Sequence, residues 1–228
     1  VPSEYMIERM IKEDLLQPVD KSLIPNLDNI NEGILGQSFD LSNNYWVPYF
    51  CGNVGILYDK TVVDEKDLEA GWSILRNTKY KNQIYMYDSE RDSFMVALKA
   101  LGYSMNTTKE REINEAYQWL LEQREEMNPV YVGDESIDTM ISGVKAMAIM
   151  YSGDAAAVMS ENPNMGYYMP KEGTNVWFDG FVISKECKQT KLANEFINYM
   201  ISDKVSYKNT VEVGYLTANV NAAAQAEK

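Results

Sequence analysis

Strand-like and helix-like hydrophobic patterns alternate along most of this chain, and this alternation constrains the fold more than any other feature. Residues 83–87 and 146–151 are short apolar runs, which are typical of strands covered on both faces of a sheet. Residues 91–101 and 110–126 carry apolar side chains at helical spacing. Alternating strands and helices predict an α/β fold.

The first and last segments of the chain give weaker signals. Residues 4–16 have apolar side chains near a helical period, Ser3 can cap that helix, and Pro18 ends it. The tail, NAAAQAEK, is small and polar, and we expect it to fray.

The stretch GTNVWFDGFVI, residues 173–183, combines an indole with a nearby carboxylate. In an extended segment alternate side chains share a face, so Trp177 and Asp179 point the same way. An aromatic face beside an anionic group suits an organic cation. The alternative is a buried strand in which Trp177 packs in a core.

The order of these patterns predicts two lobes built from three segments. The chain leaves a first segment near residue 50, builds a strand-and-helix lobe, and returns near residue 177. We therefore predict one lobe from residues 1–54 and 178–228 and a second lobe from residues 55–177. This return places Trp177 and Asp179 at a crossover between lobes, where small ligands often bind.

An acidic run, DSERD, follows the predicted strand 83–87 and opens the next helix. Ligands of open α/β sheets gather at the carboxyl ends of strands, which makes Asp88 and Asp92 candidate binding residues. Acidic residues also stabilise the first turn of a helix, and for Asp88, Glu90 and Asp92 individually that role is at least as strong an alternative as ligand binding.

Charge and residue usage exclude several classes of function. The net charge of −13 argues against nucleic acid as a partner, because phosphate binding needs clustered Lys and Arg. The chain has no His, which excludes a Ser–His–Asp triad. The cysteines, Cys51 and Cys187, are far apart in sequence and predict neither a disulfide nor a soft-metal site. We expect no metal and no cofactor, and we find no apolar run of membrane-span length and no signal-peptide pattern.

Six sequence blocks together resemble one family. They are VPSEYM, YKNQIYMYDSERDSF, ALGYSMNTT, YSGDAA, PKEGTNVWFDGFVI and VGYLTAN. Their order and spacing resemble the periplasmic or lipid-anchored polyamine-binding proteins of ABC transporters, the spermidine/putrescine-binding family. The resemblance implies a two-lobed periplasmic-binding-protein fold of type II that closes on its ligand. It also implies polyamine capture outside the cytoplasm, delivery to a membrane permease, and no enzymatic activity.

The resemblance carries over to particular positions. It implies an aromatic wall at Trp177, an amine-binding carboxylate at Asp179, an opposite aromatic wall at Tyr151, and a cleft-lining ring at Tyr215. The remaining implied ligand-binding residues are Ser3, Tyr5, Arg91, Asp92 and, in place of an acid that Ser89 replaces, Asp88.

This chain also departs from the family pattern. Cys51 stands where a Trp is usual, and Gly133 stands where a Ser often points into the cleft. The family's first strand and its C-terminal helical segment have no counterpart in this chain. We therefore expect the first lobe to be incomplete and polyamine binding to be weakened.

Two other functions are open to the same residues. The same fold could take another organic cation, an amino acid or a metal. A pair of carboxylates such as Asp92 and Asp179 could also act as acid and base on a glycoside, although no residue shows the environment that such an acid needs.

Overall fold

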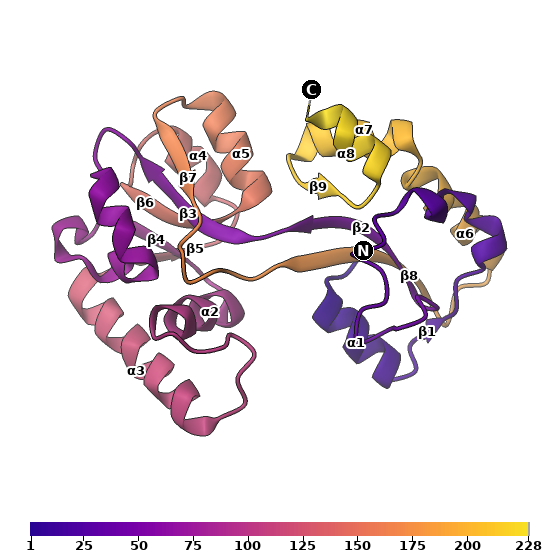
Figure 1. Ribbon diagram of the computed structural model, residues 1–228, viewed down its shortest axis with the longest axis horizontal. Coiled ribbons are helices and arrows are strands. Elements are labelled where there is room, and N and C mark those ends of the chain that lie inside the picture. The colour runs from indigo at the N-terminus through magenta and orange to yellow at the C-terminus, as the bar shows by residue number, and fades with distance from the viewer. Residues whose placement is uncertain (228) are drawn as a thin grey trace. The chain divides into compact units, whose positions relative to one another are not determined.

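The computed structural model describes residues 1–227, which form two compact units (Figure 1). Unit 1 combines Val1–Gly52 with the chain from Trp177 onward, and unit 2 is Asn53–Val176. The chain therefore passes from one unit to the other twice, after Gly52 and after Val176. Both units contain a sheet and helices, so the predicted α/β class is confirmed.

Unit 2 is built on a five-stranded sheet in the order β5-β4-β6-β3-β7. Strand β4 runs parallel to β5 and β6, whereas β3 is antiparallel to β6 and β7. Its helices and strands are β3 (Val54–Asp59), η3 (Glu65–Arg76), η4 (Thr78–Tyr80), β4 (Ile84–Tyr87), α2 (Glu90–Ala100), α3 (Glu110–Met127), β5 (Val130–Val132), α4 (Ser136–Ile141), β6 (Met147–Tyr151), α5 (Ser152–Glu161) and β7 (Met165–Tyr168).

Helices cover both faces of the unit 2 sheet, as the apolar strand runs predict (Figure 1). Successive side chains of a strand point to opposite faces, and along β6 Met147 and Ile149 join the core under α2, α3 and η3. Ala148 and Met150 join the core under α4 and α5. This sandwiching explains why β4 and β6 lack the polar alternation of a solvent-facing strand.

Two carboxylates of unit 2, Glu112 and Glu126, are held by nearby donors. Hydrogen bonds from Thr107 and Lys109 keep the pKa of Glu112 below its usual range. Arg76 does the same for the pKa of Glu126, to which it donates from both Nε and Nη2, at 3.0 and 2.7 Å. These groups couple the stability of unit 2 to pH.

We expect unit 2 to lose stability in acid. A carboxyl whose pKa is lowered by folding stabilises the fold above its unfolded pKa, about 4.3 for Glu, and that contribution disappears as pH falls through the folded pKa. Thermal melting followed by circular dichroism should therefore show a lower midpoint at pH 3 than at pH 6. The difference should shrink in Glu126→Gln and in high salt, and an identical midpoint at both pH values would contradict the prediction.

Unit 1 is built on a four-stranded sheet in the order β1-β8-β2-β9, in which all pairs are antiparallel. Its helices and strands are α1 (Glu4–Lys12), β1 (Leu16–Gln17), η1 (Lys21–Leu23), η2 (Pro25–Asn29), β2 (Trp46–Gly52), β8 (Trp177–Ser184), α6 (Thr190–Met200), α7 (Asp203–Val213), β9 (Leu216–Thr217) and α8 (Val220–Ala226).

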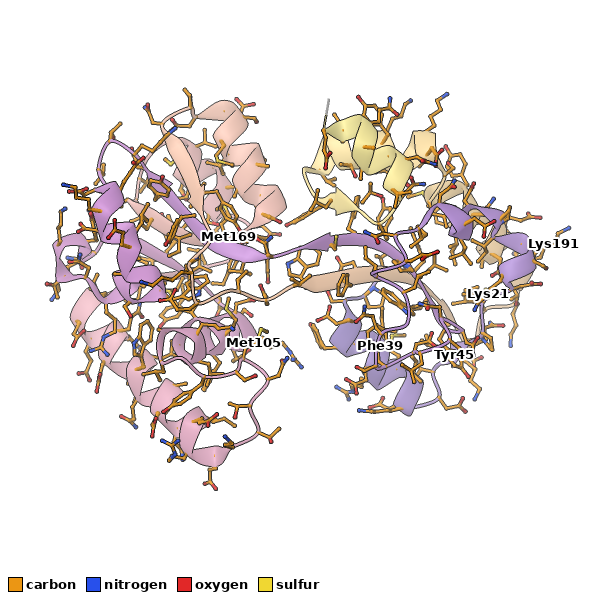
Figure 2. The ribbon with its side chains drawn as sticks, viewed as in Figure 1. Lys21, Phe39, Tyr45, Met105, Met169 and Lys191 are labelled. Atoms are coloured by element: carbon orange, nitrogen blue, oxygen red, sulfur yellow. The ribbon has the colours of Figure 1, made fainter. Side chains whose placement is uncertain are left out.

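The core of unit 1 centres on Trp46 in β2, which is fully buried. The Phe39 ring contacts it at a centroid distance of 5.0 Å, and Phe39 and Tyr45, both labelled in Figure 2, are partly buried against this core. Gly180 in β8 lies over the same indole, because a Cβ built at Gly180 would be 2.5 Å from Trp46 Cε3. This close approach needs glycine in the middle of β8.

Both end segments differ from the sequence-based prediction. The first helix ends at Lys12 instead of residue 16, because Asp14 adopts a left-handed conformation and Leu16–Gln17 pairs with β8. The predicted fraying of the tail is wrong, because Val220–Ala226 is a helix. Asn219 caps it by accepting a hydrogen bond from the Ala222 amide at 2.9 Å.

Within residues 1–227, no helix has the length and apolar character that a transmembrane span requires.

Candidate functional site

Two parallel strands of unit 2 end side by side, and each leads directly into a helix. Tyr87 ends β4 just before α2, and Tyr151 ends β6 just before α5. The Tyr87 hydroxyl accepts a hydrogen bond from the Tyr151 amide at 2.8 Å, and the two rings stack with centroids 4.6 Å apart. The carboxyl edge of this sheet therefore carries an aromatic pair.

Asp92 is a buried carboxylate beside this aromatic pair, only 5% exposed. The hydroxyl of Tyr151 donates to its Oδ2 at 2.7 Å, and the side-chain amide of Asn175 donates to its Oδ1 at 3.3 Å. Ser89 caps α2 by accepting from the Asp92 amide at 3.3 Å, which places Asp92 in the first turn of that helix. Neutral donors thus hold Asp92, and no Lys or Arg of residues 1–227 forms an ion pair with it.

A second carboxylate, Asp179, lies in β8 of unit 1 and contacts Ser3, the residue just before α1. Ser3 forms an isolated antiparallel bridge with Asp179, and the Ser3 hydroxyl donates to Asp179 Oδ1 at 2.6 Å. Ser3 is the N-cap residue of α1, as predicted, but its hydroxyl donates to Asp179 and makes no cap hydrogen bond. Glu4, the first residue of α1, also contacts β8, because its carboxylate accepts from the Phe178 amide at 3.0 Å.

Aromatic rings gather next to Asp179. The ring of Trp177 meets the ring of Tyr215 edge-to-face, with centroids 5.1 Å apart. Phe50 in β2 lies 6.3 Å from Tyr215 between ring centroids and pairs in register with Asp179. Trp177 is half-buried. Unit 1 therefore presents a carboxylate and three rings on neighbouring strands and the turn after α7.

The other predicted residues lie nearby but join these clusters less directly. Tyr5 lies on α1, two residues after Ser3, and is 43% exposed. Arg91 is an exposed side chain of α2 next to Asp92. Asp88 is exposed, forms no side-chain hydrogen bond or ion pair within residues 1–227, and borders a cavity of about 230 Å³ lined also by α3.

The two cysteines give no sign of a reactive thiol in these clusters. Cys51 and Cys187 are free thiols of unit 1, and burial raises the pKa of Cys51. Cys51 Sγ contacts the carbonyl of Leu216 at 3.7 Å, which ties β2 to β9. Across the described chain, no cluster of three or more Cys, Asp or Glu side chains could hold a metal ion.

Three residues of the clusters around Asp92 and Asp179 were not predicted from the sequence: Phe50, Tyr87 and Asn175. Phe50 and Tyr87 each lie at the end of an apolar strand run, where an aromatic residue could have signalled a site. Asn175 lies two positions before Trp177 in the block PKEGTNVWFDGFVI, and its polar side chain was the available signal.

Comparison with known protein families identifies the family to which this chain belongs. The profile of a family described as bacterial extracellular solute-binding protein matches residues 1–227. This chain belongs to that family. The predicted two-lobed periplasmic-binding-protein fold is therefore confirmed.

Solved structures and curated sequences give specific relatives of this chain. A spermidine/putrescine ABC transporter substrate-binding protein from Streptococcus pneumoniae is 38% identical, with a TM-score of 0.85 over 97% of this chain and 68% of the other. A putative spermidine/putrescine ABC transporter from Listeria monocytogenes is 37% identical, with a TM-score of 0.92 over 99% and 69%. The spermidine/putrescine-binding periplasmic protein of Salmonella typhimurium is 31% identical over 97% of this chain. The chain spans 63% of the length of that curated relative.

Proposed function

We propose that this chain is part of a receptor that captures polyamines outside the cytoplasmic membrane and delivers them to an ABC-transporter permease. The observation that carries the proposal is that Asp92 and Asp179 are both held by neutral donors and by no cation of residues 1–227. A carboxylate as buried as Asp92 is costly without a compensating charge. An ammonium group of a ligand would supply that charge.

The neighbours of each carboxylate match the rest of a polyamine. Stacked Tyr87 and Tyr151 lie beside Asp92, and Trp177 with Tyr215 lies beside Asp179. Aromatic faces attract alkylammonium groups and cover methylenes, with each cation–π contact contributing about 0.5–2 kcal/mol. Hydrogen bonds to charged groups add about 1.5–3 kcal/mol each, enough together for roughly micromolar binding after the costs of association. Tyr5, Arg91 and Asp88 are proposed as peripheral contributors.

Binding, and not catalysis, is the primary role in this proposal. The relatives from Salmonella and Streptococcus are named as binding proteins, and the residues around both carboxylates suit holding a cation. Transport through a permease requires only binding and release, so neither carboxylate needs to exchange a proton with the ligand.

Calorimetric titration of the chain tests this function. We expect putrescine and spermidine to release heat of binding, and butylamine, which has one ammonium group, to bind more weakly. Affinity should fall as salt is raised, because the attraction is between charges. Glycine and glutamate form a control panel for the amino-acid alternative. No heat from either polyamine at millimolar concentration would contradict the proposal.

A further inference from the structure

Asn175 joins the buried carboxylate of Asp92 to β3, the strand by which the chain enters unit 2. Its Nδ2 donates to Asp92 Oδ1 at 3.3 Å, and its Oδ1 accepts from the Val54 amide at 2.9 Å. Val54 is the first residue of β3, two positions after the last residue of unit 1 that precedes it. One side chain therefore contacts both the candidate ligand group and the start of β3.

The orientation of the Asn175 amide is fixed by its partners. A backbone N–H can only donate, so the oxygen of Asn175 must face Val54 and its NH₂ group must face Asp92. Thr174 reinforces this arrangement, because its hydroxyl donates to the Val54 carbonyl at 2.5 Å. The side chains of two consecutive residues thus satisfy both backbone groups of Val54.

Asp92 is consequently held on both oxygens. Tyr151 donates to Oδ2 and Asn175 donates to Oδ1, so the carboxylate cannot rotate without losing one of them. Fixing a binding group with neighbouring hydrogen bonds lowers the cost of ordering it when a ligand arrives. The charge that a ligand would meet is therefore oriented in advance.

We propose that Asn175 is a positioning residue, which orients the Asp92 carboxylate for a cationic ligand and links it to the first residue of β3. The identity of the cationic ligand rests on the function proposed above. The orientation of Asp92 by Asn175 does not depend on that function. Among titratable side chains of unit 2, Tyr151 on β6 contacts Asp92 directly, and Tyr87 on β4 stacks on Tyr151 and donates to Asp154 on α5 at 3.5 Å. Glu90 and Arg91 precede Asp92 in the first turn of α2.

Replacing the amide by a carboxylate tests the contact without a ligand. In Asn175→Asp the Val54 amide keeps its acceptor, but the second oxygen is pushed against Asp92. Two carboxylates so close cannot both ionise easily, so the pair should retain one proton well above the range of ordinary aspartates. Carboxyl ¹³C NMR of the ligand-free chain should show this coupled titration. The matched control, Asn114→Asp on the exposed face of α3, should show none.

Putrescine titration supplies the second readout. In Asn175→Asp, cation binding should release the retained proton, so the measured heat should depend on the buffer near neutral pH more strongly than it does for the unmodified chain. Asn175→Ala should fold, shift the Asp92 carboxyl resonance, and weaken putrescine binding about tenfold.

The outcomes separate the two proposals. If the unmodified chain binds no polyamine but the carboxyl introduced by Asn175→Asp titrates together with Asp92, the proposed function fails and the positioning role stands. If the introduced carboxyl titrates as an ordinary aspartate and Asn175→Ala leaves the Asp92 resonance unchanged, the positioning role is wrong. Circular dichroism of each variant establishes that it is folded, and Asn175→Ala decides the question should Asn175→Asp not fold.

Discussion

Asp179→Asn is expected to weaken spermidine binding by about 100-fold, because truncating one partner of a hydrogen-bonded charge pair leaves the other charge unpaired. The substitution keeps the size of the side chain and its contact with the Ser3 hydroxyl, which donates to Asp179 Oδ1 at 2.6 Å. It removes only the negative charge beside Trp177. Calorimetric titration of the two proteins under the same conditions measures the change.

The matched control for this charge change is Asp28→Asn. Asp28 lies in η2 of the same unit, and its side chain is exposed. The control alters the net charge by the same amount, so it reports the effect of the general electrostatic field. We expect its affinity for spermidine to stay within about twofold of the unmodified protein, since exposed charges are strongly screened. Equal losses in both variants would show that Asp179 acts only through net charge.

Trp72→Ala is expected to reduce the free energy of unfolding by about 3–5 kcal/mol, the usual cost of removing a large aromatic side chain from a core. Trp72 in η3 is fully buried, and its indole Nε1 donates to the Gly173 carbonyl at 2.9 Å. The substitution therefore leaves a cavity and also releases the segment that leads to Asn175. Urea denaturation followed by far-ultraviolet circular dichroism measures the loss.

Tyr117→Ala is the comparison for this core substitution. Tyr117 is an aromatic residue of the same unit on α3, but it is 49% exposed. We expect its replacement to change the free energy of unfolding by no more than about 0.5 kcal/mol. A Trp72→Ala loss as small as this would contradict the packing described for unit 2.

The predicted strands and helices of unit 2 agree with the structure because local patterns were sufficient there. The apolar run at residues 146–151 became β6, and the periodic run at 110–126 became α3. Each pattern reflects the burial of one or both faces of the strand or helix, and this burial does not depend on which element packs against it. The end of the first helix and the tail were predicted wrongly because distant residues decided them: β8 recruits Leu16–Gln17 into the sheet, and α8 packs against α7 with Asn219 as its cap.

The same division applies to the candidate site. The sequence pointed to Trp177 and Asp179 by their residue types and to Tyr151 by the family resemblance, and the role of all three in cation binding stays a prediction. It could not choose between Asp88 and Asp92, since both acids lie near the start of one helix. The structure shows that Asp92 is buried against Tyr151 and Asp88 is exposed.

By itself the sequence determined the α/β class, the acidic character of the chain and the presence of aromatic and acidic side chains in one short stretch, because residue type and local spacing fix these properties. Only the tertiary structure decided which donors hold each carboxylate. Asn175 reaches Asp92 across 83 positions, and Ser3 reaches Asp179 across 176. Such contacts depend on where the chain returns after folding, and no local pattern records that.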